Sequence, residues 1–201
     1  KSAAPQAEKA DACRELAVLG TKAAVPVRAA LLPDEKMNHM ARYALETIPD
    51  PSVDEALRAA LGRLKGRPLV GVIGSIGVRR DARAIDPLAR FLSDADNDVA
   101  QAAARSLGRI GTSPAAKALD RALGSASAAN QLAVCEGLFR CAETLTAKGQ
   151  RKEAGAIYDR LRGAKAPHQV RAGGLRGAIL NRGKDGVPLL VQSLRSDDWI
   201  L

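Results

Sequence analysis

The chain has 201 residues, 46% of them apolar, and its 31 lysines and arginines exceed its 22 acidic residues to give a formal charge of +9. This length and apolar content suffice for a continuous hydrophobic core, while the absence of any apolar run of about 18 residues excludes a membrane-spanning helix. Aromatic residues make up only 2% of the chain, which argues against a β-sandwich core and favours closely packed helices rich in Ala and Leu. We therefore predict an all-α fold.

An apolar pair, with members four residues apart, recurs through the chain. Such a pair lies on one face of a helix, and successive pairs are separated by about 31 residues. This regularity predicts one helix at the same place in each of several repeated units. The pairs are Val27 and Leu31, Leu57 and Leu61, Leu88 and Leu92, Leu119 and Leu123, and later Leu190 and Leu194.

A second type of apolar pair, with members three residues apart, precedes each of the first four. Each pair is followed by residues that end one helix and begin the next: Gly20-Thr21, Pro49-Asp50-Pro51, Gly77, and the turn from Gly111 to Pro114. Every unit is therefore expected to contain two helices. These pairs are Leu16 and Leu19, Leu45 and Ile48, Ile73 and Ile76, and Leu107 and Ile110.

Two short helices in about 31 residues cannot bury their apolar faces alone and must stack on neighbouring units. We predict a right-handed α-solenoid of about six antiparallel helix pairs in a single domain over residues 1–201. A start at Lys1 and an apolar end at Trp199–Leu201 suggest part of a longer chain. The expected units are about 6–32, 36–64, 67–93, 97–124, 128–164 and 167–196.

Two stretches carry a family resemblance: residues 79–100, RRDARAIDPLARFLSDADNDVA, and residues 97–127, NDVAQAAARSLGRIGTSPAAKALDRALGSAS. They resemble the short bacterial HEAT repeats also found in phycobilin-lyase-like proteins, with the pattern D-x-x-V-x-x-x-A-A-x-A-L-G-x-I-G and then A-x-x-x-L-x-x-L. The resemblance covers nearly the whole chain and implies an interaction scaffold whose concave face is lined by the second helix of each unit.

The fifth unit departs from this pattern. It is longer, and residues 136–166 look more like a tetratricopeptide pair. We expect a local change of curvature there, since the rotation between repeats sets the shape of a solenoid. The apolar residues of its second helix are Ala154, Ile157, Tyr158 and Leu161.

Basic residues recur on the helices that the resemblance places along the concave face. Acidic residues, among them Asp54, Asp86 and Asp120, interrupt them, so the face is expected to be mixed in charge. The candidate partner-binding residues are Arg28, Arg58, Arg83, Arg90, Lys117, Arg121 and Arg195. Arg79 and Arg80 are added because they fall in a connection about three residues longer than its counterparts, and extended loops on rigid scaffolds often carry function. A solvated loop is the alternative.

Three glycines, Gly71, Gly74 and Gly77, evoke a phosphate-binding loop, but no strand signal precedes them and no Lys-Ser/Thr follows them. Their spacing of three residues instead predicts a helix face that a neighbouring helix approaches closely. The Asp-rich stretch SDADNDV begins like a calcium loop, yet Val99 stands at its sixth position, where glycine is needed. Helix capping explains it.

The sequence offers no catalytic or metal-binding constellation that we would assign. His39 and His168 are the only histidines, which argues against zinc or triad chemistry. Cys13, Cys135 and Cys141 form no metal-binding or disulfide pattern and are expected as free thiols. We expect no catalytic residue, no metal and no cofactor.

Three functions remain open. The first is a non-catalytic scaffold that binds a partner protein or peptide, and the basic residues favour an acidic one. The second is binding to a nucleic-acid backbone through Arg and Lys, and the third is a lyase or glycosylase on the same scaffold. The compartment is also open, since the protein could be cytoplasmic or exported after signal removal.

Overall fold

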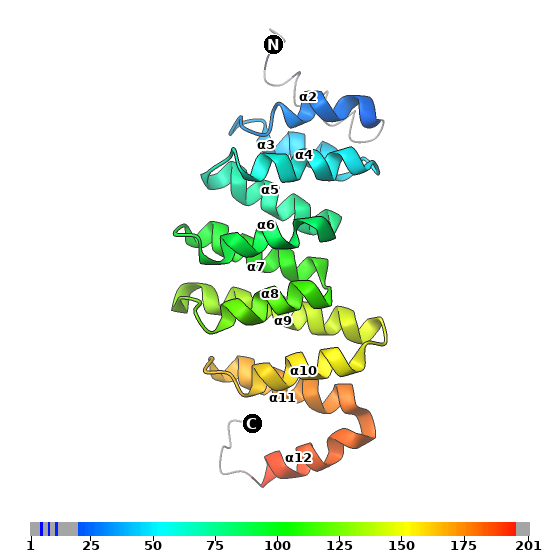
Figure 1. Cartoon of the computed structure of the whole chain (residues 1–201), viewed down its shortest axis with the longest axis vertical. Coiled ribbons are helices and arrows are strands. Elements are labelled where there is room, and N and C mark those ends of the chain that lie inside the picture. Colours follow the sequence, from blue (N-terminus) through cyan, green and yellow to red (C-terminus); the bar gives the residue numbers. More distant parts are fainter. Residues whose placement is uncertain (1–4, 6–7, 9–10, 12–19, 196–201) are drawn as a thin grey trace. The chain divides into compact units, whose positions relative to one another are not determined.

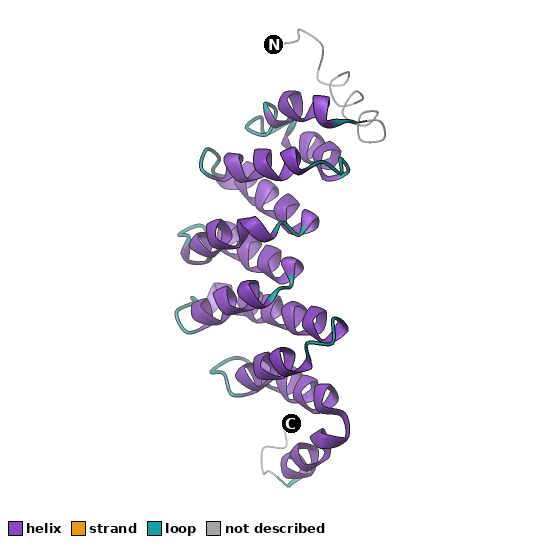
Figure 2. Ribbon diagram, turned by 45° about the vertical axis from the view of Figure 1, so that its right-hand side comes forward, coloured by secondary structure: helices purple, strands orange, loops and turns teal. Residues whose placement is uncertain are grey.

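The structure is a computed structural model that describes residues 5, 8, 11 and 20–195. Figures 1 and 2 show that its described elements are helices joined by loops and turns, as the composition predicts. The sequence features at Cys13, Leu16, Leu19 and Trp199–Leu201 lie outside the described residues.

The chain divides into two compact units, residues 1–106 and 107–201, and the division falls inside helix α7 (Asn97–Ile110). In the first unit, α5 packs against α3 and α4, and α2 packs against the same two helices. The described elements of the first unit before α7 are η1 (Lys22–Ala24), α2 (Val25–Ala29), α3 (Asn38–Glu46), α4 (Pro51–Leu61), α5 (Gly66–Arg79), η2 (Ala82–Ala84), α6 (Ile85–Arg90) and η3 (Phe91–Ser93).

In the second compact unit, the first and second helices of each sequence repeat again alternate along the chain. The helix α9 is the longest of those described, and it accounts for the longer fifth unit of the sequence repeat. The elements after α7 are α8 (Ser113–Leu123), α9 (Ala128–Ala147), α10 (Arg151–Arg162), α11 (His168–Arg182), η4 (Gly183–Gly186) and α12 (Val187–Leu194). Each unit is all-α within the described residues and is built of stacked helices of the solenoid type.

Two of the second helices, α4 and α8, begin at capping residues that the sequence suggested. The carboxylate of Asp50 accepts a hydrogen bond from Ser52 N at 2.9 Å, with Pro51 at the first position of α4. The Thr112 hydroxyl accepts from Ala115 N at 3.5 Å at the start of α8, where Pro114 occupies the first turn. A cap oxygen and an early proline together fix where a helix starts.

The repeated apolar pair forms the core in the middle of the array. Leu57, Leu88 and Leu119 are completely buried. In the first sequence repeat, about residues 6–32, the alignment was wrong by one residue. Val27 is 69% exposed, whereas Arg28 is only 2% exposed and occupies the equivalent inward position.

The predicted pair at the far end of the series was also wrong as a core pair. Leu190 and Leu194 are 42% and 77% exposed. Leu189, one residue earlier, packs instead against a core cluster that includes Leu145, Tyr158 and Ala178. The α12 helix is therefore rotated from the orientation that the repeat alignment predicts.

The glycines of α5 show a mixed outcome. A Cβ at Gly77 would lie 2.8 Å from Ser106 Cα in α7, and a Cβ at Gly71 would lie 2.5 Å from Arg42 Nε in α3. At these two positions close approach is the reason for glycine. At Gly74 a Cβ would meet nothing within 4 Å, so the prediction was wrong there. Gly77 was also wrong as a helix stop, because α5 continues to Arg79.

Candidate functional site

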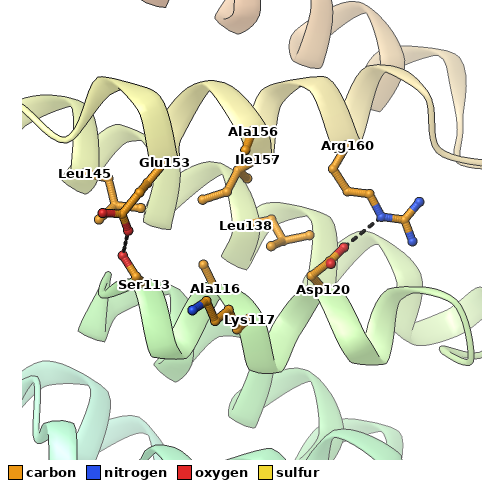
Figure 3. Close-up of a pocket in the computed structure, with 10 residues that line it drawn as sticks. All are labelled: Ser113, Ala116, Lys117, Asp120, Leu138, Leu145, Glu153, Ala156, Ile157 and Arg160. Carbon is orange, nitrogen blue, oxygen red and sulfur yellow. Dashed lines mark hydrogen bonds and ion pairs between the residues drawn. The ribbon is translucent and has the colours of Figure 1, made fainter.

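A pocket of about 360 Å³ lies between the second helices α8 and α10 of the second unit, and α9 lies beneath it (Figure 3). We call it the α8–α10 groove. Its volume is at the lower end of the range of about 300–1,000 Å³ that is usual for ligand pockets. Its lining residues are Ser113, Ala116, Lys117, Asp120, Leu138, Leu145, Glu153, Ala156, Ile157 and Arg160.

The middle of the groove is apolar. Leu138 and Leu145 lie seven residues apart, so both project from the same face of α9, and each is only 1% exposed. Ala116 on α8 and Ala156 on α10 line the sides with short side chains. Ile157 on α10 adds a larger apolar side chain to the lining, beside Leu138.

Polar contacts between α8 and α10 close both ends of the groove. At one end Arg160 Nε donates to Asp120 Oδ1 at 2.8 Å, and both side chains are 48% exposed. At the other end the Ser113 hydroxyl donates to the Glu153 carboxylate. Figure 3 shows these two contacts on either side of Leu138 and Ile157. They hold the two second helices at a set spacing.

The two cations on α8, Lys117 and Arg121, differ from Arg160 in that they form no ion pair within the described residues. Lys117 lines the groove and is exposed. Arg121, one turn further along α8, is also exposed, and its Nε donates to the carbonyl of Lys117 at 3.3 Å. Within the part of the chain that the structure describes, neither side chain pairs with a carboxylate.

The helix α10 is held in place from its other side by α11. Arg182 Nη2 donates to Asp159 Oδ2 at 2.5 Å, and Arg162 Nε donates to Asp159 Oδ1 at 2.8 Å. Burial opposes the charge on Asp159, but the two guanidinium groups outweigh it and hold the pKa of that carboxyl below its ordinary value. The Arg182–Asp159 contact thus links α10 to α11 on the side away from the groove.

The other predicted partner-binding residues have different local surroundings. Arg28 is buried, so it is not available to a partner. Arg58 forms an ion pair with Asp81. Arg83 and Arg90 are exposed around α6, and Arg195 is exposed at the end of α12. Of the predicted set, Lys117 lines the α8–α10 groove, and Arg121 lies one turn beyond it on the same face of α8.

Arg79 was wrong as a loop residue. It is the last residue of α5 and is 12% exposed. Its guanidinium forms an ion pair with Asp54 and donates to three carbonyl groups, those of Glu46, Ile48 and Asp50, at 3.2, 2.8 and 3.2 Å. It therefore closes the turn between α3 and α4.

Arg80 is exposed and has φ 53°, so it adopts the left-handed conformation that ends α5. It remains a candidate surface cation. Arg80 lies where the chain reverses direction between α5 and η2.

The cysteines Cys135 and Cys141 are free and buried. Burial raises the pKa of both thiols, that of Cys141 to about 12. In the described ranges no group of three or more His, Cys, Asp or Glu side chains is arranged to hold a metal ion. No helix in that same part of the chain is long and apolar enough to cross a membrane.

The sequence reasoning missed the α10 side of the groove. Arg160 lies 40 residues after Asp120, and Glu153 lies 40 residues after Ser113. An alignment with a period of 31 does not place these residues opposite one another, because the fifth unit is longer. The shared offset of 40 residues is the signal that could have found them.

Comparisons with known proteins support the repeat assignment. A sequence profile described as HEAT repeats matches residues 70–138. A search of curated protein sequences gave no match. An engineered protein, solved by the Northeast Structural Genomics Consortium, aligns with a TM-score of 0.51 and 19% identity over 92% of this chain and 94% of its own.

A second solved structure is the complex of CpcE and CpcF of phycocyanin lyase from Nostoc. It aligns with a TM-score of 0.40 and 18% identity over 83% of this chain and 93% of its own. The fold assignment depends on the profile match and on the engineered protein. The chain therefore has an all-helical, solenoid-type fold, and its residues 70–138 match the HEAT-repeat profile.

Proposed function

We propose that this protein is a non-catalytic scaffold that binds a partner protein through the α8–α10 groove. The observation that carries the proposal is a groove with an apolar middle, open to solvent, between two second helices that polar contacts hold apart. Apolar pockets with a few polar groups at their edges are typical binding sites. In helical-repeat proteins the surfaces between stacked units are used for binding extended partners.

The rigidity of the groove supports a binding role. Asp120 and Arg160 connect α8 to α10, and Asp159 and Arg182 connect α10 to α11. A partner that enters the groove does not have to order these helices, so little of its binding free energy is lost in rearrangement.

The arrangement of the carboxylates supports the non-catalytic part of the proposal. Asp120 and Glu153 are the acidic groups of the groove, and each already accepts a hydrogen bond from a neighbour. Their partners, Arg160 and Ser113, lie at opposite ends of the groove, and Ser113 and Asp120 are seven residues apart on α8, which corresponds to about 10 Å along a helix. That separation disfavours joint acid and base catalysis at one bond.

The distribution of the cations favours a protein partner over a nucleic-acid backbone. A backbone-binding surface needs several available cations in a row, because each phosphate contact contributes separately. Among the predicted residues Arg28 is buried, and Arg58 and Arg79 are held in ion pairs. Three of the nine predicted cations are therefore already held within the protein, which leaves fewer of them for successive phosphates.

Site-specific photo-crosslinking tests the proposal. We would place p-benzoylphenylalanine at position 156, in the groove, and separately at position 128, an exposed alanine at the start of α9 outside it. Irradiation of cells that produce the protein should yield a discrete protein adduct from position 156 and none from position 128. Equal adducts from both positions, or none from position 156, would contradict the proposal.

A further inference from the structure

We infer that the segment bound in the α8–α10 groove is an acidic peptide, with one large apolar side chain in the groove and carboxylates that contact Lys117 and Arg121. This inference depends on the proposed function and adds the chemistry of the partner. It follows from which charges around the groove are already paired.

The acidic side chains of the groove have partners within the protein. Asp120 accepts from Arg160 at 2.8 Å. Glu153 accepts from Ser113 and, at 3.3 Å, from Gln150 Nε2. A basic peptide would compete with Arg160 for Asp120 and would meet the positive charges of Lys117 and Arg121. Glu153, whose partners are neutral, is the one lining carboxylate with which it could pair directly.

The cations on α8 are in the opposite situation. Lys117 and Arg121 lie one turn apart on an exposed face, where like charges repel each other. Within the described residues, the hydrogen bond that the Arg121 side chain makes is to the backbone carbonyl of Lys117. Carboxylates from a partner would neutralise both cations without breaking any contact within the protein.

The apolar middle of the groove specifies the rest of the partner. Leu138 and Leu145 form its base, and Ala116 and Ala156 leave room above them. An apolar side chain placed there lies beside Lys117. The matching peptide therefore carries an apolar residue with acidic residues within about one helical turn of it, since Lys117 and Arg121 are themselves one turn apart, about 5–6 Å.

Selection from a displayed library of random 16-residue peptides tests this inference. Peptides would be selected on the wild-type protein and counted as groove binders when Ala156→Trp, which fills the groove, abolishes their binding. Ala128→Trp is the matched control and should leave binding unchanged. We expect the groove binders to be enriched at least threefold in Asp and Glu over the starting library, next to a Leu, Ile or Phe.

Charge-reversed variants then show whether binding depends on the two cations beside the groove or only on the net charge of the protein. The double variant K117E/R121E should weaken binding of the selected peptides at least tenfold at 150 mM salt. R176E/K184E carries the same change in net charge at exposed positions outside the groove and should weaken it less than threefold. K117Q/R121Q, a milder change, should fall between them, and circular dichroism confirms that each variant is folded.

The outcomes distinguish the inference from the proposed function. Groove binders without acidic enrichment, or equal losses in the two charge-reversed variants, overturn the inference and leave the groove as a protein-binding site. A library that yields no peptide sensitive to Ala156→Trp overturns both.

Discussion

Arg79 and Arg80 are neighbours in the chain, yet they differ in every structural respect. Arg79 is nearly buried and donates to three backbone carbonyls and one carboxylate. Arg80 is exposed and adopts a backbone conformation that suits glycine. Two identical side chains in a row therefore have opposite effects on stability, and this difference can be measured.

Replacing Arg79 by Met should lower the free energy of unfolding by about 2–3 kcal/mol, because several carbonyls and Asp54 lose a charged donor. Urea denaturation followed by circular dichroism measures the change. If Arg79→Met unfolds at the wild-type urea concentration, the guanidinium does not hold the turn between α3 and α4.

Replacing Arg80 by Gly should instead raise the free energy of unfolding by about 0.5 kcal/mol. The left-handed conformation at φ 53° is costly for a residue with a Cβ, and this cost exceeds the extra freedom that glycine has in the unfolded chain. Arg80→Ala, which keeps the Cβ, is the control and should show no such gain. A loss of stability in Arg80→Gly would contradict the assignment.

The thiol of Cys141 should make stability depend on pH in the alkaline range. Burial raises its pKa from the ordinary value of 9.0 to about 12 in the folded state. The folded protein therefore holds the proton more tightly than the unfolded chain does. Stability from this group is complete below pH 9 and is lost as the pH rises from about 9 towards 12.

A comparison of wild type with Cys141→Ala isolates this effect, because all other alkaline titrations are common to both. Between pH 9 and 11 the wild type should lose up to about 1.4 kcal/mol more per pH unit than the variant. Parallel pH profiles of the two proteins would show that the thiol ionises as easily in the folded state as in the unfolded one.

At the level of elements, helix α5 shows that equal sequence spacing does not mean equal surroundings. Gly71, Gly74 and Gly77 are three residues apart, and each step of three rotates the position by about 60° around the axis. As a result Gly71 faces α3, Gly77 faces α7, and Gly74 has open space. The helix is contacted from two directions and is free between them.

Alanine substitutions on α5 should therefore have opposite signs. Gly77→Ala should destabilise the protein by about 2 kcal/mol, because its Cβ would lie 2.8 Å from the backbone of Ser106 and force α5 and α7 apart. Gly74→Ala should stabilise it by about 0.5–1 kcal/mol, because alanine is favoured in a helix interior. Thermal unfolding of both variants provides the test. Two changes of the same sign would be inconsistent with this packing.

For the molecule as a whole, the charge of +9 attracts polyanions without defining a site. Such attraction depends on net charge and is screened by salt. It should be distinguished from recognition at the α8–α10 groove, which depends on where Lys117 and Arg121 lie.

We therefore expect any binding to a 20-base-pair DNA duplex at 50 mM salt to disappear by 200 mM salt. We also expect K117E/R121E and R176E/K184E to reduce it equally, because both change the net charge by the same amount. Fluorescence anisotropy with a labelled duplex measures this. A selective loss in K117E/R121E, or binding that persists at 200 mM, would favour the nucleic-acid function instead.

The class of fold follows from local features of the sequence. The recurrence of Leu57, Leu88 and Leu119 predicted helices whose inward residues are completely buried, and caps such as Asp50 and Thr112 marked where second helices begin. These features depend on local spacing and backbone chemistry, which a single sequence displays directly.

The groove, and the availability of each cation, depend instead on packing between distant segments. Whether an arginine is buried like Arg28, paired like Arg58 or available like Arg121 depends on which residues from other units lie beside it. The α8–α10 groove depends on Asp120 meeting Arg160 across 40 residues of chain. Contacts at that separation arise from the stacking of units of unequal length, which a regular sequence period does not encode.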